Sequence, residues 1–417
     1  MTIQQNKDRV QTTHVGSLPR PHALLDIMKR KYAGEAYDPG ALERQLRSSV
    51  MEVVAKQVAS GIDIVTDGEF SKPGFFTYVQ ERLEGFESRP NQKPNLFQKE
   101  VAAFPEYYEE YFKHAMMGGA IVSLAPVVCV GPVKYRGEQA VVQDIKNVKA
   151  AAKAAGVEAH HVFLPATAPS GVGVNEYYKS DEEYFHAVAA ALSKEYKAIV
   201  DSGVLVQIDD PFISDIFVDP DLDSLGMKKR AAMYVEAINT ALNGIPSEKV
   251  RFHTCYGINE GPRLYEAALM DVIEFVLKIN AGSFSFEAAN PRHEHEYHIF
   301  ETNKLPEGKV ICPGVITHAS NIVEHPQLIA ERIIRFANLV GRENVIASAD
   351  CGFSSQALYK TEVHHTVVWE KFKAMRQGAD LARSSSGRKV RTSGLSSHRR
   401  LNSINIRPAF ARRNNVA

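Results

Sequence analysis

The stretch from residue 180 to residue 211, SDEEYFHAVAAALSKEYKAIVDSGVLVQIDDP, decides the fold class because it holds a complete helix followed at once by a buried strand. Its first four residues form a capping box, in which serine and glutamate side chains satisfy the backbone N–H groups of a helix start. Apolar side chains then recur at helical spacing: Phe185, Val188, Leu192, Tyr196 and Ile199. Gly203 ends the predicted helix, and the apolar run VLVQI indicates a strand.

The same helix-to-strand pattern recurs along the chain, which indicates a parallel sheet with crossover helices. Residues 41–60 form a helical stripe that leads through Gly61 into DIVTDGE, and residues 326–340 lead through Gly341 into NVIASADCG. The strand candidates are THVGS, DIVTDGE, VVCVGPV, VFLPATA, VLVQIDD, VRFHTC, FSFEAA, VICPGVI and NVIASADC. A closed (β/α)8 TIM barrel uses eight strands, so we expect VVCVGPVKY to form an added hairpin outside the barrel.

The 417 residues fit one large α/β domain with insertions. We expect residues 1–11 to be an N-terminal extension and residues 12–382 to form the barrel. Residues 71–119 are rich in aromatic residues, proline and charge, and are predicted to form an inserted lid over the site. The tail, residues 383–417, is expected to be disordered and solvated.

Charge and hydropathy exclude several partners. The chain has 49 basic and 49 acidic residues, so it shows no excess charge for nucleic acid or a membrane surface. The tail holds nine of the basic residues and no acidic one. No apolar run approaches the roughly 20 residues that a membrane span needs. We therefore expect a cytoplasmic protein without nucleic-acid or membrane partners, and the sequence leaves a homo-oligomer open.

Polar residues gather at the predicted carboxyl ends of the strands, where barrel enzymes place their sites. They are Ser17, Asp67, Glu69, Asp209, Asp210, His253, Cys255, Glu287, His318, Asp350 and Cys351. In the motif HTCYG, His253 and Cys255 are two positions apart, so a strand would point both side chains the same way.

Four of these residues form a donor set that suits zinc: His253, Cys255, Glu287 and Cys351. Two thiolates and a carboxylate make the centre anionic, which disfavours water activation but leaves a bound sulfur nucleophilic. We therefore expect Zn²⁺ as the cofactor, a small thiol as the substrate and a thioether as the product. Cys129 and Cys312 lie in apolar runs, and we expect both in the core.

Seven motifs, in this order, resemble the C-terminal catalytic barrel of cobalamin-independent methionine synthase: TTHVGSLPRP, DGEFSK, QIDDP, HTCYG, SFEAAN, PGVITHAS and ADCGF. That family is a zinc-dependent thiol methyltransferase of methionine biosynthesis. The resemblance covers the chain from Thr12 to about Arg383. It implies the same four zinc ligands, a homocysteine-like thiol substrate and an alkyl donor as the second substrate.

The resemblance also implies the roles of individual residues. The backbone of Gly16 and Ser17 would hold the carboxylate of the thiol substrate, Glu69 and Asp209 would hold its amino group, and His318 would be the general acid. Opposed carboxylates suit an ammonium group, and loop N–H groups suit an anion. Hydrogen-bonding support is expected from His14, Asp210, His293, His295 and Asp350.

Two local alternatives stay open. Asp209 and Asp210 could instead cap the loop that follows them. The two histidines of HEHE, His293 and His295, could bind metal, although their place after Pro291 favours hydrogen bonding.

The substrate pair has alternatives as well. Where the long methionine synthase holds folate with an Arg-Ser pair and a tryptophan, this chain has VGPVKY and LPATAPSGV, so the donor is not implied. The stretches NEYYKSDEE, ANPRHEHE and SNIVEHP resemble epoxyalkane:coenzyme M transferase, which opens an epoxide with a zinc-bound thiolate. Arg20 and Lys72 would then be candidates to bind a sulfonate. Two other classes are a zinc hydrolase, which the two cysteines disfavour, and a barrel that binds without catalysis.

Overall fold

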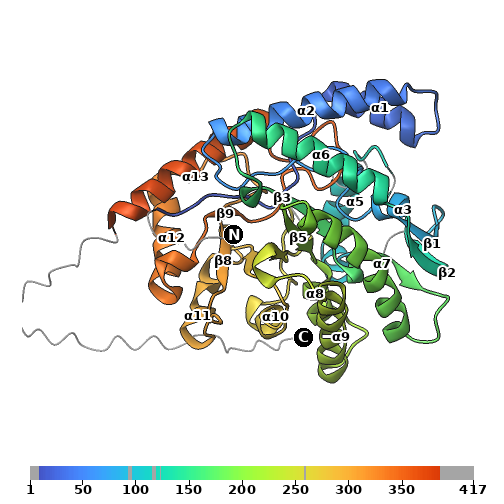
Figure 1. Ribbon diagram of the computed structural model, residues 1–417. Coiled ribbons are helices and arrows are strands. Elements are labelled where there is room, and N and C mark those ends of the chain that lie inside the picture. Colours follow the sequence, from blue (N-terminus) through green and yellow to red (C-terminus); the bar gives the residue numbers. More distant parts are fainter. Residues whose placement is uncertain (1–8, 93–95, 115–118, 123, 258–259, 386–417) are drawn as a thin grey trace, which may run out of the picture.

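The computed structural model describes residues 9–92, 96–114, 119–122, 124–257 and 260–385, which form an α/β barrel (Figure 1). Six parallel strands make one sheet in the order β3-β5-β6-β7-β8-β9. Their bounds are β3 Phe163–Thr167, β5 Leu205–Asp209, β6 Val250–His253, β7 Ser283–Phe286, β8 Val310–Ile316 and β9 Ser348–Ala349. The buried runs that the sequence predicts as strands therefore lie side by side.

Two extended segments near the N-terminus complete the ring between β9 and β3. Thr12 bridges Ala347 in parallel, and Val65 bridges Val162 in parallel. Between these two segments, the Asp63 N–H donates to the Thr12 carbonyl oxygen at 3.0 Å. Eight strand positions thus close on themselves, and the predicted TIM barrel is confirmed.

The ninth strand candidate lies outside the barrel, as predicted. It is β2, Val127–Tyr135, which pairs antiparallel with β1, Leu83–Ser88, and parallel with β4, Val174–Asn175. It is not a hairpin, however, because its antiparallel partner β1 comes from the predicted lid segment. The three strands form a small separate sheet.

Helices surround the strands (Figure 1). They are α1 His22–Tyr32, α2 Pro39–Ala59, α6 Glu138–Ala154, α7 Asp181–Asp201, α9 Ser224–Ala241, α10 Leu269–Val276, α12 Pro326–Val340 and α13 His365–Ser385. In α7 the Ser180 hydroxyl accepts from the Glu183 N–H at 3.2 Å, and the predicted apolar stripe is buried. Gly203, with φ of +90°, adopts the left-handed backbone that favours glycine after a helix.

The remaining helices lie in the connecting segments. The α-helical ones are α3 Val79–Arg82, α4 Gln98–Ala103, α5 Pro105–His114, α8 Phe212–Asp215 and α11 Ile299–Thr302. The 3₁₀ turns are η1 Ala159–His161, η2 Pro169–Gly171, η3 Ile216–Val218, η4 Ser247–Lys249, η5 Glu294–His298 and η6 Arg342–Asn344. Within the described ranges, no helix has the length and apolar composition needed to cross a membrane.

The core has an outer and an inner part. Strand residues such as Leu164 and Val206 join the large apolar cluster that packs against the helices. Their neighbours Phe163 and Leu205 point the other way and join a small cluster that includes Cys312. Because strands alternate their side chains, this small cluster fills the barrel interior. Cys312 and Cys129 are both buried, which confirms their predicted place in the core.

The ends of the barrel differ from the prediction by a few residues. Val10 is fully buried, and the Ala347 N–H donates to the Gln11 carbonyl oxygen at 2.9 Å, so the barrel begins before residue 12. Helix α13 continues to Ser385, three residues into the predicted tail. Residues 1–8 of the predicted extension and residues 386–417 of the predicted tail lie outside the described residues.

A buried ionic network ties three helices together. The guanidinium of Arg82, at the end of α3, lies 2.6 Å from Asp144 on α6 and 3.1 Å from Glu195 on α7. The hydroxyls of Tyr135 and Tyr78 also donate to the Glu195 carboxylate, at 2.7 and 3.1 Å. Removing the guanidinium would leave two buried carboxylates without their cation.

We therefore expect Arg82→Met to lower the free energy of unfolding by about 3–5 kcal/mol, as for a broken buried ion pair. Chemical denaturation of the two proteins measures the difference. Arg136→Met is the matched control, because the Arg136 side chain is exposed and donates to the Gln80 carbonyl oxygen at 2.8 Å, outside the network. The control should change stability by less than about 0.5 kcal/mol. Equal effects of the two substitutions would contradict a structural role for the network.

Candidate metal and thiol site

A cavity of about 110 Å³ lies at the carboxyl ends of the barrel strands. Six residues that the sequence predicts for the site line it: Ser17, Glu69, Asp209, His253, Cys255 and Cys351. Asp209 ends β5, His253 ends β6 and Cys351 follows β9, so the barrel brings together residues far apart in the chain. The predicted position of the site is where TIM-barrel enzymes carry theirs.

Three of the predicted metal ligands converge. The ligand atoms of His253, Cys255 and Cys351 lie within 4.8 Å of one another, and all three residues are buried. The thiol of Cys255 hydrogen bonds with Cys351; this contact, burial and the charge of Glu287 raise the pKa of Cys255 well above its usual value. Without a metal, that thiol is therefore protonated.

The imidazole of His253 fits a metal ligand. Its Nδ1 lies 3.3 Å from the Ser285 hydroxyl, and its buried Nε2 has no hydrogen-bond partner among the described residues. Burial, aided by Arg251, lowers the pKa of His253 to about 3, so the ring is neutral. Buried polar atoms are almost always satisfied, so an orphaned nitrogen beside two thiols fits a soft metal ion such as Zn²⁺.

Glu287, the fourth predicted ligand, lies next to this group but not within it. Its carboxylate lies instead in a neighbouring group with His318 and Asp350, whose ligand atoms are also within 4.8 Å of one another. Arg263 Nη2 and Asn290 Nδ2 donate to Glu287 Oε2 at 2.6 and 2.7 Å. Burial raises the pKa of Glu287 to about 7, against the opposing charge of Arg263. A metal that recruits Glu287 would compete with that ion pair.

Asp350 and His318 surround the Glu287 carboxylate. Asp350 Oδ1 accepts from the N–H groups of Ala288 and Ala289 at 2.7 and 2.8 Å, which fixes the turn that follows Glu287. The supporting role of Asp350 in the site stays a prediction. His318 is buried, and desolvation lowers its pKa well below 6.5, so its ring is neutral. Its role as a proton donor stays a prediction.

Glu69 and Asp209 lie in the same cavity as buried carboxylates. Glu69 Oε2 has no hydrogen bond within the described part of the chain, and its cation neighbour Lys72 Nζ is 3.8 Å away. Asp209 Oδ1 accepts from Gln207 Nε2 at 2.8 Å. Burial and the charge of Glu69 raise the pKa of Asp209 well above its usual value. Such a pair favours an ammonium group, which would stabilise both charges.

The Gly16-Ser17 turn fits its predicted role only in part. The Gly16 N–H donates to His14 Nδ1 at 3.2 Å, so it is not available to a substrate carboxylate. His14 is held in turn by Gln57 Oε1 at 2.8 Å, and its supporting role stays a prediction. Ser17 lines the cavity and remains the candidate for that carboxylate. Gly16 itself is needed because an added Cβ would lie 2.7 Å from the Pro165 ring.

The capping alternative holds for Asp210 and not for Asp209. Asp210 Oδ1 accepts from the N–H groups of Phe212 and Ile213 at 3.0 and 3.1 Å, which caps the start of α8. Asp209 makes no such contact and faces the cavity. Asp210 therefore holds the loop after β5, and its supporting role in the site stays a prediction.

The two histidines of HEHE separate. His293 Nδ1 and Nε2 lie 2.7 Å from Glu296 and 3.0 Å from Glu266, so neither nitrogen is open to a metal. Burial by itself would lower the pKa of His293, but the hydrogen bonds with the two glutamates raise it to about 9. His293 also stacks on Tyr256 at 4.0 Å, next to Cys255. His295 is exposed on η5, and the structure does not bring it to the site.

Arg20 and Lys72, the candidates to bind a sulfonate, already donate hydrogen bonds to backbone carbonyl oxygens. The Arg20 guanidinium donates to the carbonyl oxygens of Glu69 at 2.7 Å and Lys72 at 2.8 Å. Lys72 Nζ donates to the Pro165 carbonyl oxygen at 2.5 Å. Among the described residues, no lysine or arginine lines the cavity. The structure thus offers a sulfonate no partner at these positions.

The predicted lid segment forms one wall of the cavity. Phe75, Phe76, Leu96 and Phe97, all from residues 71–119, line it. Within the same segment, the Phe75 N–H donates to the Ser355 carbonyl oxygen at 2.9 Å, which joins this wall to the loop after Cys351. An apolar wall of this kind would exclude water from the site. Opening and closing of the segment stays a prediction.

Two important residues were not foreseen from the sequence. Arg263 is buried with φ of +54° and pairs with both Glu287 and Glu266 at 2.6 Å. Asp215 lines the cavity from the end of α8. Arg263 stands in an irregular loop and Asp215 ends a four-residue helix, and neither segment is long enough or regular enough for periodicity to mark a residue as buried or functional. The only local signal was the sequence GPR shortly after HTCYG.

Comparisons with known proteins agree with this picture. The family model described as "Cobalamin-independent synthase, Catalytic domain" matches residues 167–379, just over half of the chain. A methionine synthase of Thermococcus kodakarensis is 24% identical over 388 residues, which are 92% of this chain and 96% of that protein. The uncharacterised protein YxjH of Bacillus subtilis is 26% identical over 366 residues, or 85% of this chain and 90% of that protein.

Among solved structures, a B12-independent methionine synthase from Shewanella sp. W3-18-1 superimposes with a TM-score of 0.68. It is 20% identical, and the match covers 91% of this chain and 99% of that one. At this level of identity the likeness concerns the fold, which it confirms as the same barrel.

Proposed function

Since the chain belongs to the family of cobalamin-independent synthase catalytic domains, we propose that it is a methyltransferase acting on a small amino-acid thiol. The sulfur of the thiol would attack a methyl carbon and form a thioether. One observation carries the proposal: two thiols and an imidazole for a soft metal share a cavity with two carboxylates suited to an ammonium group. The methionine synthase relatives that span the same length support it.

The metal in this proposal is zinc, held by His253, Cys255 and Cys351, with Glu287 as the fourth ligand. When bound, it would lower the pKa of a coordinated thiol and keep the sulfur nucleophilic at neutral pH. The neutral ring of His253 and its orphaned nitrogen support this assignment.

The chain's own residues would bind and orient the thiol substrate. Glu69 and Asp209 would hold its ammonium group, and Ser17 would face its carboxylate. The apolar wall from the lid segment, residues 71–119, would keep water away from the sulfur. His318 would supply a proton where the leaving group needs one.

Three other functions have less support. An epoxide-opening enzyme for a sulfonate thiol would need cations in the cavity, and within the part of the chain that the structure describes none lines it. A zinc hydrolase would need a more cationic metal than two thiolates leave. A barrel that only binds would have no use for the converging thiols.

Thiol activation can be tested without knowing the natural donor. The zinc-loaded protein is incubated at pH 7 with homocysteine and iodomethane, and methionine is measured by mass spectrometry. A free thiol with a pKa of about 8.5 is only a few per cent ionised at pH 7, so full activation would raise the rate up to about 30-fold. A rate equal to that of a protein-free control would contradict the proposed function.

A further inference from the structure

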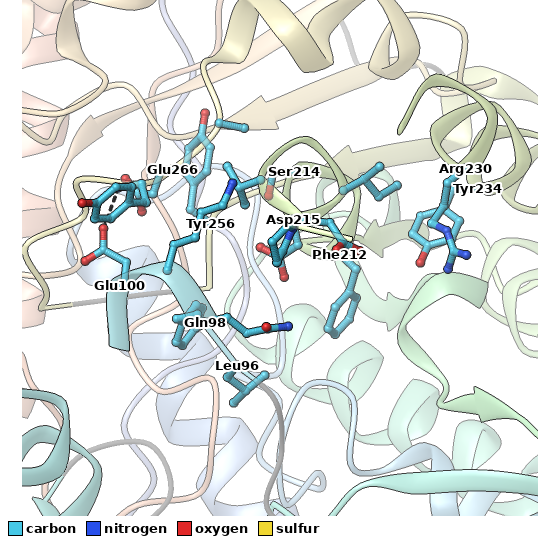
Figure 2. Close-up of a pocket in the computed structure, with 18 residues that line it drawn as sticks. Leu96, Gln98, Glu100, Phe212, Ser214, Asp215, Arg230, Tyr234, Tyr256 and Glu266 are labelled. Carbon is cyan, nitrogen blue, oxygen red and sulfur yellow. Dashed lines mark hydrogen bonds between the residues drawn. The ribbon is translucent and has the colours of Figure 1, made fainter. Parts of the chain in front are cut away.

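A second cavity, of about 230 Å³, adjoins the thiol cavity (Figure 2). The two share four lining residues: Leu96, Phe97, Phe212 and Asp215. A group that is transferred to the thiol must reach the sulfur from a neighbouring site, because the first cavity is small. The second cavity is therefore placed where the second substrate of a thiol transferase would bind.

The walls of this cavity combine aromatic rings with carboxylates. The aromatic residues are Phe97, Phe212, Tyr234, Tyr256 and Tyr265. The acidic residues are Glu100, Asp215, Asp219 and Glu266. Figure 2 shows Asp215 in the middle of the lining residues, with Phe212 beside it, Arg230 and Tyr234 on one side and Glu100 and Glu266 on the other. Aromatic faces and carboxylates together favour a cation.

The cations that line the cavity leave Asp215 without a partner. Arg230 forms its ion pair with Asp181, at 3.6 Å, and not with Asp215. The side chain of Lys99 is exposed to solvent. Glu266 is already paired with Arg263 at 2.6 Å, whereas the Asp215 carboxylate has no hydrogen bond or ion pair among the described residues. The Asp215 carboxyl group is thus free to pair with whatever occupies the cavity.

The surroundings of Asp215 support a cationic occupant. Asp215 is accessible to solvent, yet the protein around it and the charges of Asp210, Glu266 and Asp219 raise its pKa to about 8. A carboxylate among like charges is stabilised by a cation beside it. An anionic ligand in the same place would meet only repulsion from these residues.

We propose that this second cavity binds the methyl donor and that the donor is an onium compound, a sulfonium or quaternary ammonium ion held by Asp215 and the aromatic walls. This rests on the proposed thiol methyltransferase function. The thiolate sulfur forms a bond to the methyl carbon while the bond from that carbon to the positive sulfur or nitrogen breaks. The electron pair stays with the leaving group, which departs as a neutral thioether or tertiary amine. The proton of the thiol is released, so charge and atoms balance without an acid at the leaving group.

The test compares charged and uncharged donors on the zinc-loaded protein. Trimethylsulfonium, tetramethylammonium, 5-methyltetrahydrofolate and iodomethane are each supplied with homocysteine, and methionine formation gives kcat/KM. We expect transfer from an onium donor. In Asp215→Asn the ratio of kcat/KM for that donor to the value for iodomethane should fall about tenfold, as expected for the loss of a charge-assisted contact. Asp221→Asn, which removes an exposed charge from the same loop, is the matched control and should leave the ratio unchanged.

A second variant tests the donor site even if Asp215→Asn does not fold. Phe212→Leu removes an aromatic face but no charge, and the same ratio should fall about threefold. An unchanged ratio in both variants overturns the proposed donor site. Reaction with iodomethane but with neither onium donor overturns the donor class. If the protein does not accelerate the reaction of homocysteine with iodomethane, the proposed thiol function itself is wrong.

Discussion

Cys351→Ser is expected to remove the bound metal and, with it, thiol alkylation. Cys351 contributes one of only two thiols to the group formed with His253 and Cys255. A hydroxyl is a much poorer zinc ligand than a thiolate. Loss of residues that merely support ligands costs 10- to 100-fold in metal affinity, so the loss of a ligand should exceed about 100-fold. Elemental analysis of the purified protein and the iodomethane reaction with homocysteine give the two readouts.

The matched control is Cys129→Ser. Cys129 is also buried, but it stands on β2 outside the barrel, where its thiol donates to the Gly131 carbonyl oxygen at 3.3 Å. A serine hydroxyl can make the same hydrogen bond, so the metal content should stay at that of the wild type. If Cys351→Ser retains a full equivalent of zinc, or if both variants lose it alike, the three-residue metal group is wrong.

Asp209→Asn is expected to weaken the binding of amino-acid thiols selectively. The Asp209 and Glu69 carboxylates lie in the thiol cavity without a lysine or arginine lining it among the described residues. A charge-assisted hydrogen bond contributes roughly 1.5–3 kcal/mol, so KM for homocysteine should rise about 10- to 100-fold. The thiol 3-mercaptopropionate has no ammonium group and should show a far smaller rise. Steady-state kinetics with iodomethane as the electrophile measure both.

Glu69→Gln should likewise raise KM for homocysteine more than KM for 3-mercaptopropionate. The exposed Asp201 provides a control in Asp201→Asn, which should leave KM for both thiols at the wild-type value. An equal loss with both thiols would mean that Asp209 and Glu69 support the cavity and do not hold an ammonium group. A wild-type preference for 2-mercaptoethanesulfonate would favour the epoxide-opening alternative.

The barrel could be predicted because each helix and strand carries its own local signal. In α7 the cap at Ser180, the buried stripe and Gly203 all lie within one stretch, and the structure confirms each of them. The added hairpin was wrong because its partner β1 reads LEGFES, with only Leu83 buried, and pairs across a long connection. Pairing between distant and mostly exposed segments leaves no pattern in the local sequence.

The site was predictable where residues end strands. His253 ends β6, Cys255 lies in the turn just after it, and the barrel brings Cys351 to both from the end of another strand. The position of Glu287 was not predictable, because it depends on Arg263, which sits in an irregular loop with φ of +54°. His295 was misplaced because the segment forms a 3₁₀ turn, in which residues two apart do not share a face.

The central claim is that the sulfur of the substrate meets a metal held by cysteine thiolates. The most direct measurement is the absorption spectrum of the cobalt-substituted protein before and after homocysteine is added. We predict a sulfur-to-cobalt charge-transfer band in the protein alone, which gains intensity and shifts with homocysteine but not with homoserine, its hydroxyl analogue. The absence of a sulfur-to-cobalt band in the protein, or a band that does not change when homocysteine is added, would contradict this claim.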